Sequence, residues 1–160
     1  MLLEKKNAVI YGAGGEIGST VARAFAREGA RVFLAGRTLA PIEALAEEIT
    51  RAGGRAEAAQ VDALDQQAIE KHLAEVVQKT GGIDISFNLI GIGYEQGEPL
   101  TEMTLESFTL PIADAMKTQF LTTTAAARHM SKKGSGVILV VNKAKSDQVL
   151  RSRVINQREE

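Results

Sequence analysis

The chain has 160 residues, enough for one domain with a buried core and too few for two. Its composition is 44% hydrophobic and 24% charged with a formal net charge of −1, which argues against nucleic acid as an electrostatic partner. The absence of cysteine excludes disulfides and thiolate chemistry, and no apolar run of about 18 residues predicts a membrane span. We therefore expect a cytoplasmic protein that binds neither nucleic acid nor membranes.

Short apolar runs alternate along the chain with longer stretches of helical periodicity. The short runs predict buried strands, and the longer stretches place apolar side chains three or four residues apart, as on one face of a helix. Asp65 and Thr104 suit the N-caps of the last two predicted helices, and Pro111 is expected to kink or divide the second of these. The predicted strands are residues 8–11, 32–35, 56–61, 83–90 and 137–141, and the predicted helices are residues 17–28, 41–52, 66–79 and 104–133.

This alternation of strands and helices predicts an α/β domain. Strand–helix–strand units give parallel strands joined by right-handed crossovers, so helices cover both faces of the sheet. We expect a doubly wound parallel sheet of about five strands in a three-layer αβα arrangement, formed by residues 1–142. Residues 143–160 are expected to form a divergent charged tail, because their few apolar residues stand among many charged ones. A short surface helix is the alternative for this tail.

A glycine-rich loop joins the first predicted strand to the first predicted helix. Its glycines are Gly12, Gly14, Gly15 and Gly18. Bare backbone N–H groups and the positive end of a helix stabilise the pyrophosphate of a dinucleotide, and a Cβ would block its approach. The spacing departs from the usual GxGxxG, and glycines also occur in strand-to-helix turns that bind nothing. The position of the loop in the first βαβ unit favours a dinucleotide site in a Rossmann-type fold.

The end of the second predicted strand indicates which dinucleotide binds. An NAD site places a carboxylate there for the ribose 2′-hydroxyl, whereas this chain has Arg37 and Thr38, with no acid before Glu43. A guanidinium pairs with a 2′-phosphate that a carboxylate would repel, so Arg37 predicts NADP(H). The missing carboxylate also counts against a methyltransferase that binds S-adenosylmethionine. A solvated arginine at a strand end is the alternative interpretation.

Four segments in order resemble motifs of the short-chain dehydrogenase/reductase family, over about residues 6–142. In the glycine loop, Gly12, Ile17 and Gly18 match the family's TGxxxGxG, while Tyr11 and Glu16 replace its threonine and middle glycine. Val61-Asp62-Ala63 is similar to the family's strand-three aspartate motif. In residues 83–91, Asn88 and Gly91 fit the family's NNAG motif, whereas Leu89 and Ile90 depart from it. Residues 134–141 resemble the family's glycine-led fifth strand.

The resemblance implies a set of cofactor-binding residues. Arg37 would hold the 2′-phosphate, Asp62 the adenine, and Asn88 with Gly91 the ribose and nicotinamide side. Asp62 as a turn residue and Asn88 as a partner of neighbouring backbone are the alternatives. The expected cofactor-binding residues are Gly12, Gly14, Gly15, Ile17, Gly18, Arg37, Thr38, Asp62, Ala63, Asn88, Ile90 and Gly91.

The catalytic residues of the family have no counterpart in this sequence. The family uses a tyrosine, a lysine four residues later, a serine and a helix asparagine. The only tyrosines, Tyr11 and Tyr94, lack that lysine, and alignment places Lys143 and Ala115 where the serine and asparagine belong. We expect no catalytic residues in a chain truncated before the tyrosine–lysine segment. A frameshift or an early stop is our hypothesis for this departure.

The last predicted helix raises the question of partners. Met116, Phe120 and Leu121 are expected in the core, and the matching helix of the family packs against another subunit. An exposed apolar stripe on residues 104–133 would therefore imply a homo-oligomer. A non-catalytic nucleotide-sensing or partner-binding module is the main alternative function, and a poorly folded remnant is the other. The two histidines have no partners at ligand spacing, so no metal site is expected.

Overall fold

The computed structural model describes residues 1–91, 99 and 101–141. The predicted tail, residues 143–160, lies outside the described residues. Each predicted strand and helix is present, although the fourth strand is two residues shorter at each end than predicted. The elements in chain order are β1 (Asn7–Tyr11), α1 (Glu16–Arg27), β2 (Arg31–Gly36), α2 (Leu39–Arg51), β3 (Arg55–Gln60), α3 (Gln66–Thr80), β4 (Ile85–Asn88), α4 (Leu105–Lys133) and β5 (Val137–Val140).

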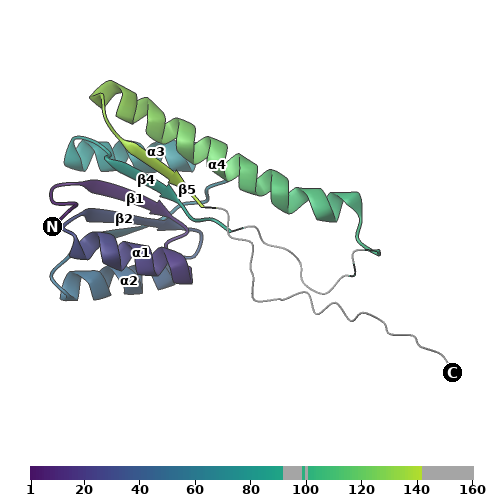
Figure 1. Ribbon diagram of the computed structural model, residues 1–160, viewed down its shortest axis with the longest axis horizontal. Coiled ribbons are helices and arrows are strands. Elements are labelled where there is room, and N and C mark those ends of the chain that lie inside the picture. The colour runs from purple at the N-terminus through teal and green to yellow at the C-terminus, as the bar shows by residue number, and fades with distance from the viewer. Residues whose placement is uncertain (92–98, 100, 142–160) are drawn as a thin grey trace.

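The strands form one parallel sheet in the order β3-β2-β1-β4-β5. Helices α1 and α2 cover one face, and α3 and α4 cover the other (Figure 1). The predicted α/β fold, a doubly wound parallel sheet in three layers, is confirmed. From β1 the chain first builds outward to β2 and β3, then crosses to β4 on the other side. The carboxyl ends of β1 and its neighbours therefore bound the crevice where ligands bind in such folds.

Burial on both faces explains why the strands read as continuous apolar runs. In β1, Ala8 and Ile10 belong to the core beneath α1 and α2, whereas Val9 and Tyr11 belong to the core beneath α3 and α4. All four side chains are at most 1% exposed. A strand covered on both sides has no polar face, so its sequence shows no alternation.

Helix α4 is longer than the sheet that it covers. Pro111 lies inside it without dividing it, so the expectation of a division was wrong. A proline in the second turn removes only its own N–H from the helical hydrogen bonds, and twenty-two residues of regular helix follow it in α4 (Pro111 to Lys133). The helix projects beyond the sheet at its N-terminal end (Figure 1).

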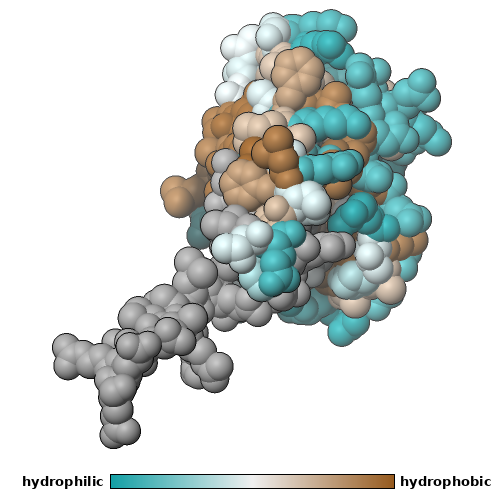
Figure 2. All heavy atoms as spheres, turned by 90° about the vertical axis from the view of Figure 1, so that its right-hand side faces the viewer, coloured by the Kyte–Doolittle hydropathy of each residue, from teal (hydrophilic) through white to brown (hydrophobic). Residues whose placement is uncertain are grey.

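Helix α4 carries apolar side chains into solvent. Met116 and Phe120 are 47% and 67% exposed, so the prediction that they belong to the core was wrong, whereas Leu121 is buried as predicted. Sequence periodicity located the helix but not which of its faces is covered, because Ala115, Thr118 and Leu121 at the same level of the helix are buried. Apolar side chains gather on this end of the molecule (Figure 2). The other large exposed apolar residues of α4 are Leu105, Phe108, Leu110 and Ile112. None of the helices in the described residues has the length and hydropathy to cross a bilayer.

Asp84 ties together the amino ends of the sheet. Its Oδ2 accepts a hydrogen bond from the Asn7 backbone N–H at 2.9 Å, and its Oδ1 accepts one from Lys133 Nζ at 2.6 Å. Lys6 Nζ lies 3.5 Å from the same Oδ1. Partial burial alone would raise the pKa of this carboxyl, but the hydrogen bonds from Lys133 and Asn7 and the nearby charges of Lys133 and Lys6 outweigh it and lower the pKa. The charged form of Asp84 therefore stabilises the fold.

We expect Asp84→Asn to lower the free energy of unfolding by about 1 kcal/mol at neutral pH, because a charge-assisted hydrogen bond becomes a neutral one. The folded-state pKa is depressed, so the stabilisation is complete above the ordinary carboxyl pKa of about 4 and is lost as the pH falls through the folded pKa. Urea unfolding at several pH values should show wild type and variant converging in acid. Glu43→Gln, an exposed position on α2, serves as the control. A difference that persists undiminished in acid would contradict the assignment.

Candidate functional site

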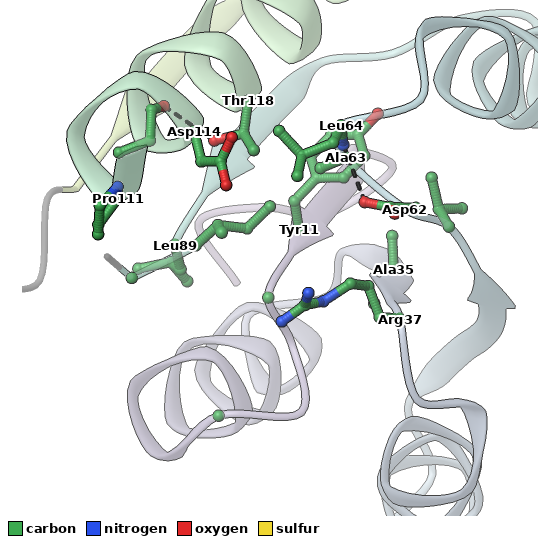
Figure 3. Close-up of a pocket in the computed structure, with 17 residues that line it drawn as sticks. Tyr11, Ala35, Arg37, Asp62, Ala63, Leu64, Leu89, Pro111, Asp114 and Thr118 are labelled. Carbon is green, nitrogen blue, oxygen red and sulfur yellow. Dashed lines mark hydrogen bonds between the residues drawn. The ribbon is translucent and has the colours of Figure 1, made fainter. Parts of the chain in front are cut away.

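A pocket of about 450 Å³ opens at the carboxyl ends of the central strands (Figure 3). It lies at the switch point of the strand order, between the glycine loop and helix α4. Its lining residues are Tyr11, Gly12 and Gly15 from β1 and the following loop, Ala35, Gly36 and Arg37 from the end of β2, Val61, Asp62, Ala63 and Leu64 after β3, Leu89, Ile90 and Gly91 after β4, and Pro111, Asp114, Ala115 and Thr118 from α4.

Seven of the twelve predicted cofactor-binding residues line this pocket. They are Gly12, Gly15, Arg37, Asp62, Ala63, Ile90 and Gly91. The other five lie beside it, in the glycine loop, the first turn of α1, the start of α2 and the end of β4. They are Gly14, Ile17, Gly18, Thr38 and Asn88. Segments far apart in the sequence thus meet at one crevice.

Gly12 and Gly18 shape the glycine loop through backbone packing. Gly12 has a φ of +79°, which favours glycine, and its N–H donates to the Ala35 carbonyl at 3.0 Å. A Cβ added to Gly18 would overlap the Gly12 carbonyl oxygen and lie 2.8 Å from Ala13 Cα. Helix α1 therefore begins in direct contact with the turn that leaves β1, and no larger residue than glycine fits at Gly18 without displacing backbone.

Gly14 and Gly15 have ordinary space around them instead. A Cβ at Gly14 would lie 3.4 Å from Ile42 Cγ2, and one at Gly15 would lie 3.5 Å from the Gly12 carbonyl oxygen. Gly15 is the N-cap of α1 and contributes no side-chain hydrogen bond to the first turn of the helix. The first-turn amides of α1 therefore have no side-chain acceptor, which is the arrangement of a helix N-terminus that binds an anion.

Arg37 and Asp62 stand at the ends of β2 and β3, on the rim of the pocket. Arg37 is exposed, and its side chain extends from the end of β2 toward the glycine loop (Figure 3). Its guanidinium makes no hydrogen bond or ion pair with the described residues. Asp62 uses Oδ1 to accept the backbone N–H of Leu64 at 2.9 Å, which leaves Oδ2 free for a ligand.

Asn88 supports the pocket from behind. Its side chain is buried, with Nδ2 donating to Thr122 Oγ1 and Oδ1 accepting the backbone N–H of Ile90, both at 2.9 Å. One amide thus joins β4 to α4 and fixes the turn that carries Leu89, Ile90 and Gly91 into the pocket. Each of its polar atoms makes one hydrogen bond within the protein, so Asn88 positions this wall of the site.

Tyr11 fills the position of the family's threonine with a much larger side chain. It is 1% exposed, and its hydroxyl has no hydrogen-bond partner among the described residues. Burial raises the pKa of this phenol well above its ordinary value, because the phenolate would lose its hydration. Tyr11 is therefore a neutral phenol at physiological pH.

Helix α4 contributes a wall of the pocket that sequence reasoning missed. Asp114 and Thr118 lie one helical turn apart and both line the pocket. Thr118 Oγ1 donates to the Ala115 carbonyl at 2.9 Å, whereas Asp114 has no hydrogen bond or ion pair within the described residues. The i, i+4 spacing of two polar residues beside the buried Ala115 was the available signal for a face directed at a ligand.

The comparisons place this geometry in a family. Residues 6–151 match the family model for short chain dehydrogenases. The chain is 34% identical over 146 residues to the L-rhamnose 1-dehydrogenase (NAD(P)(+)) of Azotobacter vinelandii and 30% identical over 145 residues to the gluconate 5-dehydrogenase of Gluconobacter oxydans, which cover 88% and 91% of it. The chain belongs to the short-chain dehydrogenase family.

Solved structures agree with this assignment. A metagenomic short-chain oxidoreductase in complex with NADP superposes with a TM-score of 0.80 at 30% identity, covering 92% of this chain and 66% of the other. A short-chain dehydrogenase/reductase of Mycobacterium marinum superposes with a TM-score of 0.77 at 33% identity, covering 86% of this chain and 56% of the other. The chain spans about half the length of the curated relatives that it matches, since it covers 56% of both dehydrogenases.

The two kinds of glycine predict opposite outcomes for the same substitution. Gly18→Ala should destabilise the fold by about 1–3 kcal/mol, because the new methyl group overlaps backbone that cannot move aside cheaply. Gly14→Ala should leave the free energy of unfolding within about 1 kcal/mol of wild type, because its Cβ meets only a side chain at van der Waals distance. Denaturant unfolding measures both variants. Equal stability of the two would contradict the close contact at Gly18.

Proposed function

We propose that the crevice binds NADP(H) as the cofactor site of a short-chain dehydrogenase. The observation that carries the proposal is the exposed Arg37 at the end of β2, which has no partner among the described residues and extends toward the glycine loop. A guanidinium in this place suits a 2′-phosphate, and no carboxylate from the end of β2 competes for it. The NADP complex of a structural neighbour supports the same cofactor.

The residues of the crevice fit such a cofactor. The first-turn amides of α1, reached past Gly14 and Gly15, would hold the pyrophosphate, since they lack side-chain acceptors and are not shielded by a Cβ. Asp62 would accept a hydrogen bond from the adenine with its free oxygen. Ile90 and Gly91 would border the ribose and nicotinamide side. When bound, the nicotinamide would supply or accept a hydride.

We further propose that this chain alone does not complete carbonyl reduction. Ala115 occupies the place of the family's helix asparagine and offers no polar atom, and Tyr11 is a buried neutral phenol without a lysine four residues later. Positioned acid–base groups contribute about 10²- to 10⁴-fold to such reactions. The names of two relatives indicate a sugar and a sugar acid as their substrates. We do not assign such a substrate to this chain, because the similarity covers only about half of each relative.

A non-catalytic module that senses NADP(H) or binds a partner is the second candidate function. The exposed apolar side chains on the projecting end of α4 favour it, because a large apolar surface of this kind commonly marks an interaction site. In that case the surface would serve a homo-oligomer or a full-length relative. Measuring the mass of the purified chain in solution, alone and mixed with a full-length relative, separates these possibilities.

Arg37→Asp tests the cofactor proposal. We expect the affinity for NADPH to fall at least about tenfold and the affinity for NADH to change by less than about threefold, because only NADPH carries the phosphate that the guanidinium binds. Cofactor fluorescence titrations with both dinucleotides measure the change. Lys71→Asp makes the same charge change at an exposed position of α3 and should leave both affinities unaltered. Equal loss for the two cofactors, or none, would rule out the role of Arg37.

The catalytic proposal has its own test. Purified chain that binds NADPH should show no oxidation of it above background when offered sugar-derived and other carbonyl compounds, followed by the absorbance of the reduced cofactor. A full-length relative run in parallel confirms that the assay detects turnover. Oxidation at an ordinary enzymatic rate, about 1 s⁻¹ or faster, would refute the proposal.

A further inference from the structure

Asp114 is an ionisable side chain of the pocket that neither the fold nor the proposed cofactor contacts explain. It lies on α4 and is half-buried, and its carboxylate points into the pocket from the wall opposite the end of β2 (Figure 3). Among the described residues it has no hydrogen bond or ion pair that would account for its position. A carboxylate that faces a pocket without a protein partner is available to accept a hydrogen bond from a ligand.

The charges that line the pocket restrict which part of a ligand can lie near Asp114. The charged side chains of the lining are one guanidinium, Arg37, and two carboxylates, Asp62 and Asp114. The two carboxylates repel phosphate, so an anionic portion is confined to Arg37 and the amides of α1. The portion between Asp62 and Asp114 must instead carry no negative charge, and a group that donates hydrogen bonds suits the two carboxylates.

In an NADP(H) molecule the exocyclic amino group of adenine meets this requirement. It carries two N–H donors, whereas Asp62 has only one oxygen free, because Leu64 N–H occupies the other. A 2′-phosphate held by Arg37 keeps the adenosine ribose at the end of β2, and the adenine that it carries can then extend toward the residues after β3 and α4, which line the same pocket. A second carboxylate on α4 can accept the donor that Asp62 leaves.

We infer that Asp114 is a specificity-determining residue that accepts a hydrogen bond from the 6-amino group of the adenine, together with Asp62. This inference rests on the proposed binding of NADP(H). It predicts that the pocket discriminates against a 6-oxo purine, since an oxo group facing two carboxylates presents an acceptor to acceptors. Discrimination by a site built to hydrogen-bond a polar group is strong because its own polar atoms are otherwise left unpaired.

The test uses NADPH and its deamino analogue, in which hypoxanthine replaces adenine. Wild type should bind the analogue at least about tenfold more weakly. Asp114→Asn, which is isosteric and can donate to the oxo group, should reduce this ratio about tenfold. Because the ratio is measured within one variant, partial unfolding lowers both affinities equally and leaves it unchanged. Asp114→Ser provides a second variant in which the ratio should also fall.

Glu106→Gln removes a charge from an exposed position of the same helix and should not alter the ratio. If Asp114→Asn changes both affinities by the same factor, the carboxylate acts on a ribose hydroxyl or through repulsion, and the inference is overturned. If wild type binds both dinucleotides but does not distinguish them, the inference fails while the proposed function stands. If wild type binds neither dinucleotide, the proposed function itself fails, and the inference fails with it.

Discussion

The contact between Gly18 and the Gly12 carbonyl is the constraint on which the candidate site depends. It brings the first turn of α1 against the turn that leaves β1, closer than any Cβ allows. The amide groups of that turn are thereby fixed at the centre of the sheet, beside β1. At β1 the strand order changes direction, with β2 and β3 on one side and β4 and β5 on the other. An anion bound there meets preorganised donors and requires no side chain to be ordered, which is why the loop can dispense with lysine or arginine.

The strand order then supplies the rest of the pocket. Because β1 lies between β2 and β4, the residues after each of these strands emerge on either side of the glycine loop. Arg37 comes from one side, and the Leu89–Gly91 turn comes from the other, held by the buried amide of Asn88. The pairing of the strands thus brings residues distant in sequence to the same pocket. The side-chain hydrogen bonds of Asn88 then fix the wall formed by Leu89–Gly91.

Sequence reasoning captured the elements whose environment is local. Strands buried on both faces read as apolar runs, and Asp65, predicted as an N-cap, accepts hydrogen bonds from Gln67 and Ala68. It failed where distant surroundings decide: the helix through Pro111 continues. Phe120 faces solvent because it lies on the uncovered face of α4, although Leu121 and Thr122 beside it are buried. Asp114 was missed for a related reason. Its spacing to Thr118 is visible in the sequence, but the pocket that this face lines forms only when α4 packs across β4.

The pocket and the exposed apolar surface are formed by different parts of the described fold. Every wall of the pocket comes from β1 to β4, the segments that follow them, and α4, and the sheet beneath it is covered on both faces. At the β5 edge of the sheet, apolar side chains are exposed instead of buried. Val137, Leu139 and Val140 of β5 are at least 40% exposed, as are several apolar residues of α4. An edge strand with exposed apolar side chains is a surface on which another segment or chain can pack. The proposed cofactor site therefore depends on β1 to β4, the segments after them and α4, whereas the exposed apolar side chains of β5 and α4 form a separate surface that suits contact with a partner.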